Sequence, residues 1–339
     1  QKTAYEIVSR DWSSDVCSSD LGQKTMLDRP LFAVSWILGR FCNYKCSYCN
    51  PGNYCGESRN DENLITYINN LEVITNKYRE LGYENFKFFF SGGEPTAWKN
   101  FIPICEWIRN RLPLATIAVN TNLSRPLAWW QKHYQLFDDI VASFHVEFAH
   151  KEKYTENSIF LCDKVNYLSS KMLMHDERFW EVVDFGNSLK EVMPNYFIEW
   201  TPIFDEMSVN AGPWQYKDTQ KEKFIAEHNV EMNFTIPKPF KDSKTASYNR
   251  YDDGSKMVTN SNDIIVQGQN FFSGWNCSVG DAIFISPVGN VSLASCGQGD
   301  SVGHILDDIS KVGPLEITCN KSHCHCGTDI IIPKFTLSK

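Results

Sequence analysis

Three cysteines on one short stretch constrain this chain more than any other feature. The spacing C-x3-C-x2-C joins Cys42, Cys46 and Cys49, and the triplet follows an apolar, strand-like run at residues 31–38. Three thiolates on one loop can bind three irons of a cubane cluster and leave the fourth open, whereas a ferredoxin-type site supplies four cysteines. An open iron can bind a substrate or a cofactor. Zinc is the alternative, but structural zinc usually takes four ligands in paired knuckles, and no histidine is close in sequence.

A Gly-Gly-Glu-Pro segment follows the next strand-like run. Residues 86–96 read Phe-Lys-Phe-Phe-Phe-Ser-Gly-Gly-Glu-Pro-Thr, and Tyr48 is the aromatic residue directly before the third cysteine. Together and in this order, the two motifs resemble those of the radical SAM superfamily. The resemblance implies that the three cysteines hold a 4Fe-4S cluster whose open iron chelates S-adenosylmethionine (SAM). It also implies reductive cleavage of SAM to a 5'-deoxyadenosyl radical, which takes hydrogen from a substrate while the protein positions and shields the chemistry.

The resemblance extends to residues that contact SAM. The segment after the second strand is expected to contact the methionyl amino group, and glycines allow a backbone to approach a ligand closely. Tyr48 is expected to help place SAM. The residues of this segment are Gly92, Gly93, Glu94 and Pro95.

Two further strand ends carry polar candidates for SAM contacts. Asn120 and Asn122 stand where the family has Thr-Asn-Gly, although Leu123 replaces the glycine. Ser143 and His145 share one face of the following strand because side chains alternate with a period of two. Their family position suggests a ribose or carboxylate contact. For His145, a hydrogen-bonded core histidine is the alternative.

Strands and helices alternate about six times between residues 31 and 202, which predicts an α/β fold. We expect a partial (β/α)6 TIM-like barrel, incomplete relative to eight units, whose open side admits a bulky substrate. His175 and Glu199 are expected at the barrel mouth, where catalytic groups cluster, as candidates for substrate contact. The expected strands are 31–38, 86–90, 115–121, 140–145, 171–175 and 196–202, and the expected helices are 64–81, 98–111, 155–170 and 177–193.

A second group of cysteines lies near the end of the sequence. A hairpin of residues 282–285 and 291–294 should bring Cys277 and Cys296 together. This part resembles the twitch or SPASM-type extension of radical SAM enzymes, which holds auxiliary 4Fe-4S clusters, and its shorter cysteine set fits one cluster in a small C-terminal β-hairpin and helix domain. Zinc bound with His323 or His325 is the alternative. The preferred ligands are Cys277, Cys296, Cys319 and Cys324, with Cys326 able to replace one of the last pair.

The sequence divides into four expected regions. Residues 11–21 can be back-translated into a sequence like a common sequencing-library adapter, so we expect residues 1–25 to be a non-native extension and the native chain to begin at or near Met26. Residues 26–204 would form the radical SAM core. Residues 205–263 would form a connector or cap across the barrel opening, and residues 264–339 the auxiliary cluster domain.

Composition narrows the partners and the compartment. The chain has 339 residues, 42% of them hydrophobic, and can bury a large core. No apolar run reaches roughly 18 residues, which argues against a membrane partner. A net charge of -8 disfavours nucleic acid as a partner. Twelve unevenly spaced cysteines indicate metal binding in a reducing cytoplasm. The resemblance to radical SAM enzymes implies a reducing electron donor such as flavodoxin or ferredoxin.

These features predict a radical SAM oxidoreductase or modifying enzyme. The expected substrate is a small polyol or aminosugar oxidised at carbon, and the alternative is a peptide side chain in a ribosomal natural product. If the native chain begins near Met26, no room precedes the core for a leader-peptide-binding domain, which favours the small molecule. An iron-sulfur or zinc protein without catalytic activity, which binds a partner, is the alternative from another class.

Overall fold

The structure is a computed structural model that describes the parts of the chain carrying its regular elements. These parts are residues 24–26, 31–49, 63–194, 196–203, 216–231, 247–250, 256–259, 270–324, 327–330 and 332–335. Within them the strands form two sheets, one of nine strands and one of six.

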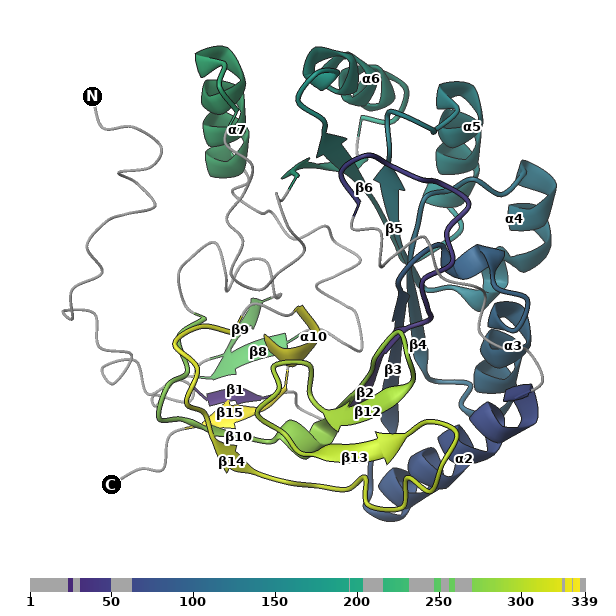
Figure 1. Cartoon of the computed structure of the whole chain (residues 1–339), viewed down its shortest axis with the longest axis vertical. Helices are drawn as coiled ribbons and strands as arrows, with labels where there is room; N and C mark the ends of the chain where they lie inside the picture. The colour runs from purple at the N-terminus through teal and green to yellow at the C-terminus, as the bar shows by residue number, and fades with distance from the viewer. Residues whose placement is uncertain are drawn as a thin grey trace.

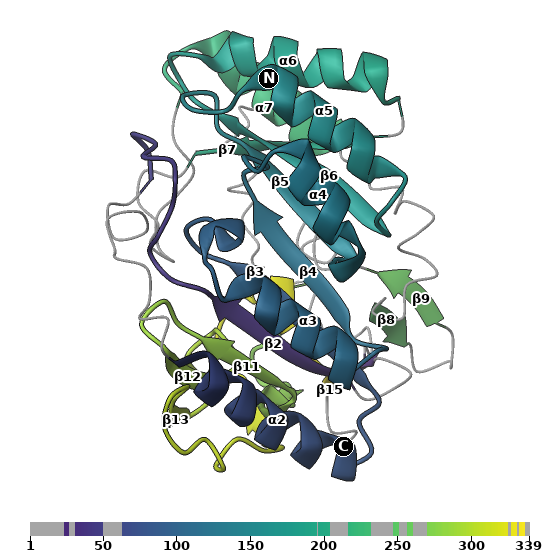
Figure 2. The same cartoon turned by 90° about the vertical axis from the view of Figure 1, so that its right-hand side faces the viewer.

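Six strands of the larger sheet lie side by side in chain order and pair in parallel. The helices that connect them cover one face of the sheet (Figure 1), and Figure 2 shows these helices in front of the strands. Sequential parallel strands joined by helices are the units of a β/α barrel, so the predicted α/β fold class is confirmed. The strands are β2 (Leu31–Ile37), β3 (Asn85–Ser91), β4 (Thr116–Thr121), β5 (Asp139–Phe144), β6 (Tyr167–Met174) and β7 (Phe197–Pro202), and the helices are α2 (Leu64–Glu80), α3 (Phe101–Arg111), α4 (Leu127–His133), α5 (Lys151–Cys162) and α6 (Phe179–Val192).

The expected elements differ from the structure in two places. Helix α4 was not expected, and the helix expected over residues 155–170 is wrong at its end, because α5 stops at Cys162 and β6 begins at Tyr167. Among the described residues, three short 3-10 helices accompany the main elements. They are η4 (Pro95–Ala97), η5 (Tyr134–Leu136) and η6 (Val279–Asp281).

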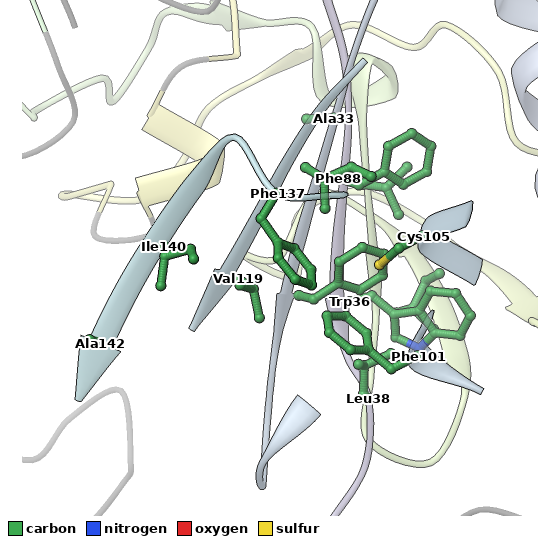
Figure 3. Close-up of a cluster of buried hydrophobic side chains, with 14 of the residues drawn as sticks. Ala33, Trp36, Leu38, Phe88, Phe101, Cys105, Val119, Phe137, Ile140 and Ala142 are labelled. Carbon is green, nitrogen blue, oxygen red and sulfur yellow. The ribbon is translucent and has the colours of Figure 1, made fainter. Parts of the chain in front are cut away.

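Aromatic side chains form the core between the sheet and its helices. Phe32 stacks on Tyr78 of α2 with ring centroids 3.8 Å apart, and Trp36 meets Tyr67 of the same helix edge to face at 5.6 Å. Figure 3 shows Cys105 of α3 beside the rings of Trp36 and Phe101, and burial raises the pKa of its thiol. Burying such rings contributes about 1.5–3 kcal/mol each, so the helix-covered face supplies the main cohesion of the barrel.

The other face of the same strands carries charged side chains. Alternation along each strand turns Lys87 and Lys171 away from the helices, because their neighbours in sequence are core residues. Lys87 Nζ lies 3.6 Å from Asp139 Oδ2, and Lys171 Nζ lies 3.4 Å from Glu199 Oε1. The inner face of the described barrel therefore holds paired charges.

The C-terminal hairpin extends the barrel sheet. β11 (Ala282–Ile285) pairs in parallel with β2, and β12 (Asn290–Leu293) and β13 (Ser301–His304) continue the sheet in antiparallel fashion. The expected hairpin is therefore present. Its pairing with the first barrel strand joins regions far apart in the sequence into one sheet.

Helix α2 is fastened to the C-terminal segment by side-chain hydrogen bonds to backbone carbonyls. Asn70 Nδ2 donates to the carbonyl of Ile305 at 2.6 Å, and Lys77 Nζ donates to that of Val312 at 2.6 Å. The hydroxyl of Tyr78 donates to the Gly280 carbonyl. These bonds hold the C-terminal backbone at Gly280, Ile305 and Val312 against helix α2, although a domain boundary was expected between the two parts.

The six-stranded sheet combines both ends of the chain. Lys24 and Thr25 fall in the segment expected to be non-native, yet they form part of β1 (Lys24–Met26). β1 pairs with β15 (Lys334–Phe335) and with β8 (Ser247–Arg250). The expected domain division stays a prediction. The remaining elements are α7 (Thr219–Glu231), β9 (Lys256–Thr259), β10 (Asn276–Cys277), β14 (Ile317–Thr318) and α10 (Gly327–Ile330).

Helix α7 belongs to the expected connector but packs on the outer side of β7. The ring of Phe224 meets Trp200 edge to face, with centroids 5.3 Å apart. Most other residues of the connector lie outside the described parts of the chain. Among the helices of the described residues, none combines the length and apolar character needed to cross a bilayer.

Asp281 predicts a pH-dependent stability. Burial raises the pKa of its carboxyl to about 6, even though Tyr83 donates a hydrogen bond to it at 2.7 Å. A carboxyl whose pKa is raised by folding stabilises the fold least when ionised, so its penalty grows as the pH rises from about 4 to above 6. Asp281→Asn keeps the acceptor for Tyr83 and should raise the free energy of unfolding by about 1–3 kcal/mol at pH 8, and by less at pH 4. Urea unfolding across this pH range measures the effect.

The matched control is Asp308→Asn. Asp308 is fully exposed, and a hydrogen bond from the backbone of Ser310 lowers the pKa of its carboxyl. This substitution should give no gain at pH 8. A loss of stability at pH 8 in Asp281→Asn would contradict the inferred burial penalty.

Candidate metal and cofactor site

The cysteine loop leaves the C-terminal end of β2. Cys46 is buried, whereas Cys42 and Cys49 are half-buried, and the amide of Cys49 donates to the Cys46 carbonyl at 3.1 Å. The three thiols lie within electrostatic range of one another. Burial raises the pKa of Cys42 to about 11 and that of Cys46 to about 12. Without a bound metal these thiols are therefore protonated, and a metal must displace their protons in order to bind.

The donor set fits a cubane cluster better than a single ion. In the described residues, no group of three or more His, Cys, Asp or Glu side chains could hold one metal ion. A cubane cluster takes each thiolate on a different iron, so thiols spread around a loop suit it. Within the described part of the loop, residues 41–49, three soft sulfur donors suit the iron-sulfur site with an open iron that the sequence predicts.

The Gly-Gly-Glu-Pro segment contacts the backbone of the cysteine loop. Gly92 and Gly93 have φ values of +86° and +53°, which favour glycine. A Cβ on Gly93 would lie 2.0 Å from the carbonyl oxygen of Phe41, the residue before the first cysteine. The amide of Glu94 donates to that same oxygen at 2.8 Å. The close approach that requires glycine in this structure is therefore to the loop backbone, whereas the sequence suggested a ligand.

The carboxylate of Glu94 is buried and fully engaged. It accepts hydrogen bonds from the Thr96 amide and hydroxyl, from the Thr121 hydroxyl at 2.8 Å and from the Asn122 amide at 2.7 Å. Burial raises the pKa of Glu94, and these donors act against the rise. Glu94 thus ties the ends of β3 and β4 together beneath the loop. Pro95 is buried in η4 beside it.

The Asn122 side chain connects the end of β4 to the cysteine loop. Its Nδ2 donates to Asn43 Oδ1 at 3.0 Å, and Asn43 Nδ2 donates to Ser124 Oγ at 2.9 Å. Leu123, which stands at the family's glycine, has a φ of +53° and occupies the left-handed region without glycine's freedom. Asn120 Oδ1 is buried and has no hydrogen-bond partner among the described residues. Asn120 therefore remains a candidate for ligand contact, while Asn122 holds the loop.

His145 lies against the cysteine loop directly after β5. Its Nδ1 is 2.8 Å from the Tyr48 hydroxyl and 3.5 Å from Cys46 Sγ, and the two rings stack with an interplanar angle of 6°. Burial lowers the pKa of His145 to about 4, so the ring is neutral. The structure thus places Tyr48 and His145 together at the cluster side of the barrel. Ser143 lies on β5, in register with Lys171 of β6.

The two substrate candidates occupy different depths. His175 follows β6 and meets the Tyr48 ring at 5.7 Å, which places it at the loop end of the barrel. Glu199 pairs in register with Lys171, four residues before His175 along β6, and lies roughly 13 Å deeper. Only His175 is therefore at the expected mouth.

Sequence reasoning missed Glu147. Its carboxylate accepts from the amide of Ser47 at 2.7 Å and lies 3.3 Å from His175 Nε2. Burial raises the pKa of Glu147, but the bonds from Ser47 and His175 outweigh it and hold the pKa below its ordinary value. Side chains alternate along the strand, so Ser143 and His145 were expected on one face, and the next residue in that series is Glu147. Extending this pattern by two residues would have identified Glu147 from the sequence.

The C-terminal cysteines gather at a second place. Cys277 and Cys319 are buried, Cys296 and Cys324 are half-buried, and Cys277 lies within electrostatic range of the other three. Burial raises the pKa of Cys277 to about 11 and that of Cys324 to about 12, and the nearby ammonium of Lys334 acts against both rises. The structure thus brings the four preferred cysteines into one neighbourhood. Cys326 and His325 lie outside the described residues.

Polar side chains brace the segments that carry these cysteines. Gln298 donates to Cys319 Sγ at 3.3 Å, and Asn270 Nδ2 donates to the Cys324 carbonyl at 3.1 Å. The buried carboxylate of Asp329 accepts from the Ser295 amide at 3.0 Å, next to Cys296. Buried Lys334 Nζ donates to the carbonyls of Asp329 and Ile332 at 2.5 and 3.0 Å. His323, the described alternative ligand, packs its ring on Phe271.

Comparison with known proteins places the cysteine loop in a family. Residues 36–153 match the Radical SAM superfamily, a range that contains both motifs. The chain carries a radical SAM domain. This confirms the family expected from the two motifs, and it supports a 4Fe-4S cluster and SAM at the cysteine loop. The twitch or SPASM assignment of the C-terminal part stays a prediction.

Curated relatives resemble only part of this chain. GTP 3',8-cyclase from Pasteurella multocida (strain Pm70) is 33% identical over 94 residues, 27% of each protein. GTP 3',8-cyclase from Haemophilus influenzae (strain ATCC 51907 / DSM 11121 / KW20 / Rd) is 34% identical over 119 residues, 33% of this chain and 34% of the relative. The chain spans about a quarter to a third of the length of these curated relatives.

Solved structures resemble more of the chain at lower identity. Native anSMEcpe with bound AdoMet has a TM-score of 0.49 and 17% identity, covering 83% of this chain and 79% of that chain. BtrN in complex with AdoMet and 2-DOIA has a TM-score of 0.40 and 14% identity, covering 82% and 79%.

The contact between Gly93 and Phe41 predicts a specific loss of cluster binding. Gly93→Ala places a methyl group against the Phe41 carbonyl, so the cysteine loop must shift. We expect anaerobically reconstituted Gly93→Ala to lose most of the iron held by the loop cysteines, measured as iron per chain and as charge-transfer absorption.

Gly82→Ala is the matched control. Gly82 also has a positive φ, +88°, but a Cβ there meets nothing within 4 Å. It should cost about 1 kcal/mol of stability for its backbone conformation and keep its iron. Equal iron loss in both variants would refute the role of the close approach.

Proposed function

We propose that this chain is a radical SAM enzyme that abstracts hydrogen from a small substrate. The observation that carries this proposal is the hydrogen bond from the Glu94 amide to the Phe41 carbonyl, which joins the Gly-Gly-Glu-Pro segment to the cysteine loop directly before Cys42, within the matched radical SAM range. When bound, a 4Fe-4S cluster and SAM supply the electron and the 5'-deoxyadenosyl radical. The protein's own part is to hold the thiols, orient SAM and exclude water from the radical.

The residues around the loop divide this work. Glu94 and Asn122 tie strand ends to the loop and keep the thiols in place. Asn120, with its unsatisfied buried oxygen, and Ser143 on the neighbouring strand are proposed to contact SAM. The backbone of Gly92 to Pro95 is proposed to meet the methionyl amino group.

The inner face of the barrel favours a small polar substrate without high charge. Each described lysine there has a carboxylate partner, because Lys87 faces Asp139 and Lys171 faces Glu199. Such pairs offer both donors and acceptors to hydroxyl and amino groups, which suits a polyol or an aminosugar. Binding a triphosphate would need cationic side chains that are not already paired with carboxylates. A peptide, whose polarity is similar to that of a polyol or an aminosugar, remains the alternative substrate.

A purine nucleotide is the second candidate substrate, favoured by the name of the curated relatives, GTP 3',8-cyclase. Their similarity spans about a third of this chain or less. The two candidates separate by whether GTP or an amino-polyol accelerates 5'-deoxyadenosine formation.

The C-terminal cysteines are proposed to bind one auxiliary 4Fe-4S cluster in a twitch-like module. Four cysteines braced by Gln298, Asn270, Asp329 and Lys334 form a prepared site, and a buried ammonium offsets the negative charge of a tetrathiolate cluster. This cluster would accept an electron from the substrate radical. We propose a cytoplasmic enzyme reduced by flavodoxin or ferredoxin.

An anaerobic reconstitution with iron and sulfide tests both clusters. The wild-type chain should hold about eight irons and release 5'-deoxyadenosine from SAM when dithionite is added. Replacing Cys42, Cys46 and Cys49 by alanine should remove about four irons and abolish 5'-deoxyadenosine. Replacing Cys277, Cys296, Cys319 and Cys324 should remove the other irons and leave SAM cleavage measurable.

The control is Cys162→Ala, which removes a half-buried thiol at the end of α5, away from both groups. It should change neither count. Zinc without iron in the wild-type protein, and no 5'-deoxyadenosine, would overturn the proposed function. About four irons with zinc at the C-terminal cysteines would overturn the auxiliary cluster alone.

A further inference from the structure

A carboxylate at the end of a barrel strand is hydrogen-bonded to the turn between the second and third loop cysteines. Glu147 lies just beyond β5, and its Oε2 accepts a hydrogen bond of 2.7 Å from the amide of Ser47. Ser47 directly follows Cys46 in the sequence. The other oxygen of Glu147 lies 3.3 Å from His175 Nε2, after β6. One side chain therefore connects the cysteine loop to the ends of two barrel strands.

The same carboxylate brings negative charge to the loop. Its hydrogen bond to the Ser47 amide places the carboxylate one residue from Cys46, where its charge disfavours further negative charge at the loop. Half-burial of Glu147 keeps this interaction from being fully screened by solvent.

We propose that Glu147 is a positioning residue that holds the Ser47 turn and lowers the reduction potential of the cluster bound by the loop cysteines. This inference rests on the proposed function, because it requires a cluster at Cys42, Cys46 and Cys49. Cluster potentials depend on net charge, hydrogen bonds and solvent exposure. Reduction adds one electron, taken from dithionite in the test, to a cluster that thiolates already make negative, and a fixed carboxylate nearby opposes that electron.

Two substitutions separate the effect of the hydrogen bond to Ser47 from the effect of the negative charge. Glu147→Gln keeps an oxygen that can accept from the Ser47 amide and removes the charge. Glu147→Ala removes both. The test measures the midpoint potential of the loop cluster by EPR-monitored titration in protein whose four C-terminal cysteines are replaced by alanine, together with the rate of iron loss to a chelator.

Glu147→Gln should raise the midpoint potential and keep its iron. At a fixed potential we expect about three- to tenfold more reduced cluster than in the parent protein, where tenfold corresponds to about 59 mV for one electron. Glu147→Ala should lose iron to the chelator several-fold faster. Glu147→Asp keeps the charge and should retain a potential near that of the parent, which decides the electrostatic part even if the amide variant binds its cluster poorly.

Glu152→Gln is the charge-matched control. Glu152 is a strongly exposed residue of α5, so the same loss of one charge is screened by solvent. A shift of the midpoint potential in Glu147→Gln no larger than in this control would overturn the electrostatic role. An unchanged rate of iron loss in Glu147→Ala would overturn the role of the hydrogen bond to Ser47 in holding the turn. A parent protein that forms no loop cluster would instead overturn the proposed function on which this inference rests.

Discussion

The hydrogen bond from the Glu94 amide to the Phe41 carbonyl is the contact on which the candidate site depends. It joins the loop that leaves β2 to the loop that leaves β3, just before the first cysteine. The contact is possible only because Gly93, with its positive φ, leaves no Cβ against the same oxygen. Parallel pairing of β2 and β3 brings these loops to one edge of the sheet. The placement of the cysteines therefore depends on the strand pairing together with this one close approach of the two backbones.

Because side chains alternate along each strand, the residues that stabilise the barrel and the charged residues lie on opposite faces of the sheet. Aromatic residues such as Trp36 and Phe101 fill the helix-covered face, where burial supplies the stability. The opposite face carries paired charges such as Lys171 with Glu199, which contribute little cohesion but can bind polar groups. Because one strand serves both faces, substitutions on the inner face can change function without removing the core.

The predictable part of the structure was the part encoded locally. The apolar runs fixed the strands, and the cysteine spacing with Gly-Gly-Glu-Pro identified the family. The start of β6 was mispredicted because Ser170 looks too polar for a buried strand, yet its hydroxyl is satisfied by Tyr154 and Tyr196 from other elements. Glu147 was missed for the same reason, since its partners Ser47 and His175 are distant in sequence. The pairing of β11 with β2 is likewise a long-range contact that no local pattern shows.

That pairing also limits what the second cysteine group can do in the proposed function. Ala294, two residues before Cys296, donates its amide to Ala282, which pairs with Ala33 near the start of β2. Cys42, in contrast, follows the other end of β2. At roughly 3.3 Å per residue the two levels are separated by most of the strand, too far for one small substrate to bind metal at both places. The C-terminal site therefore suits transfer of an electron from the substrate radical better than a second ligand contact.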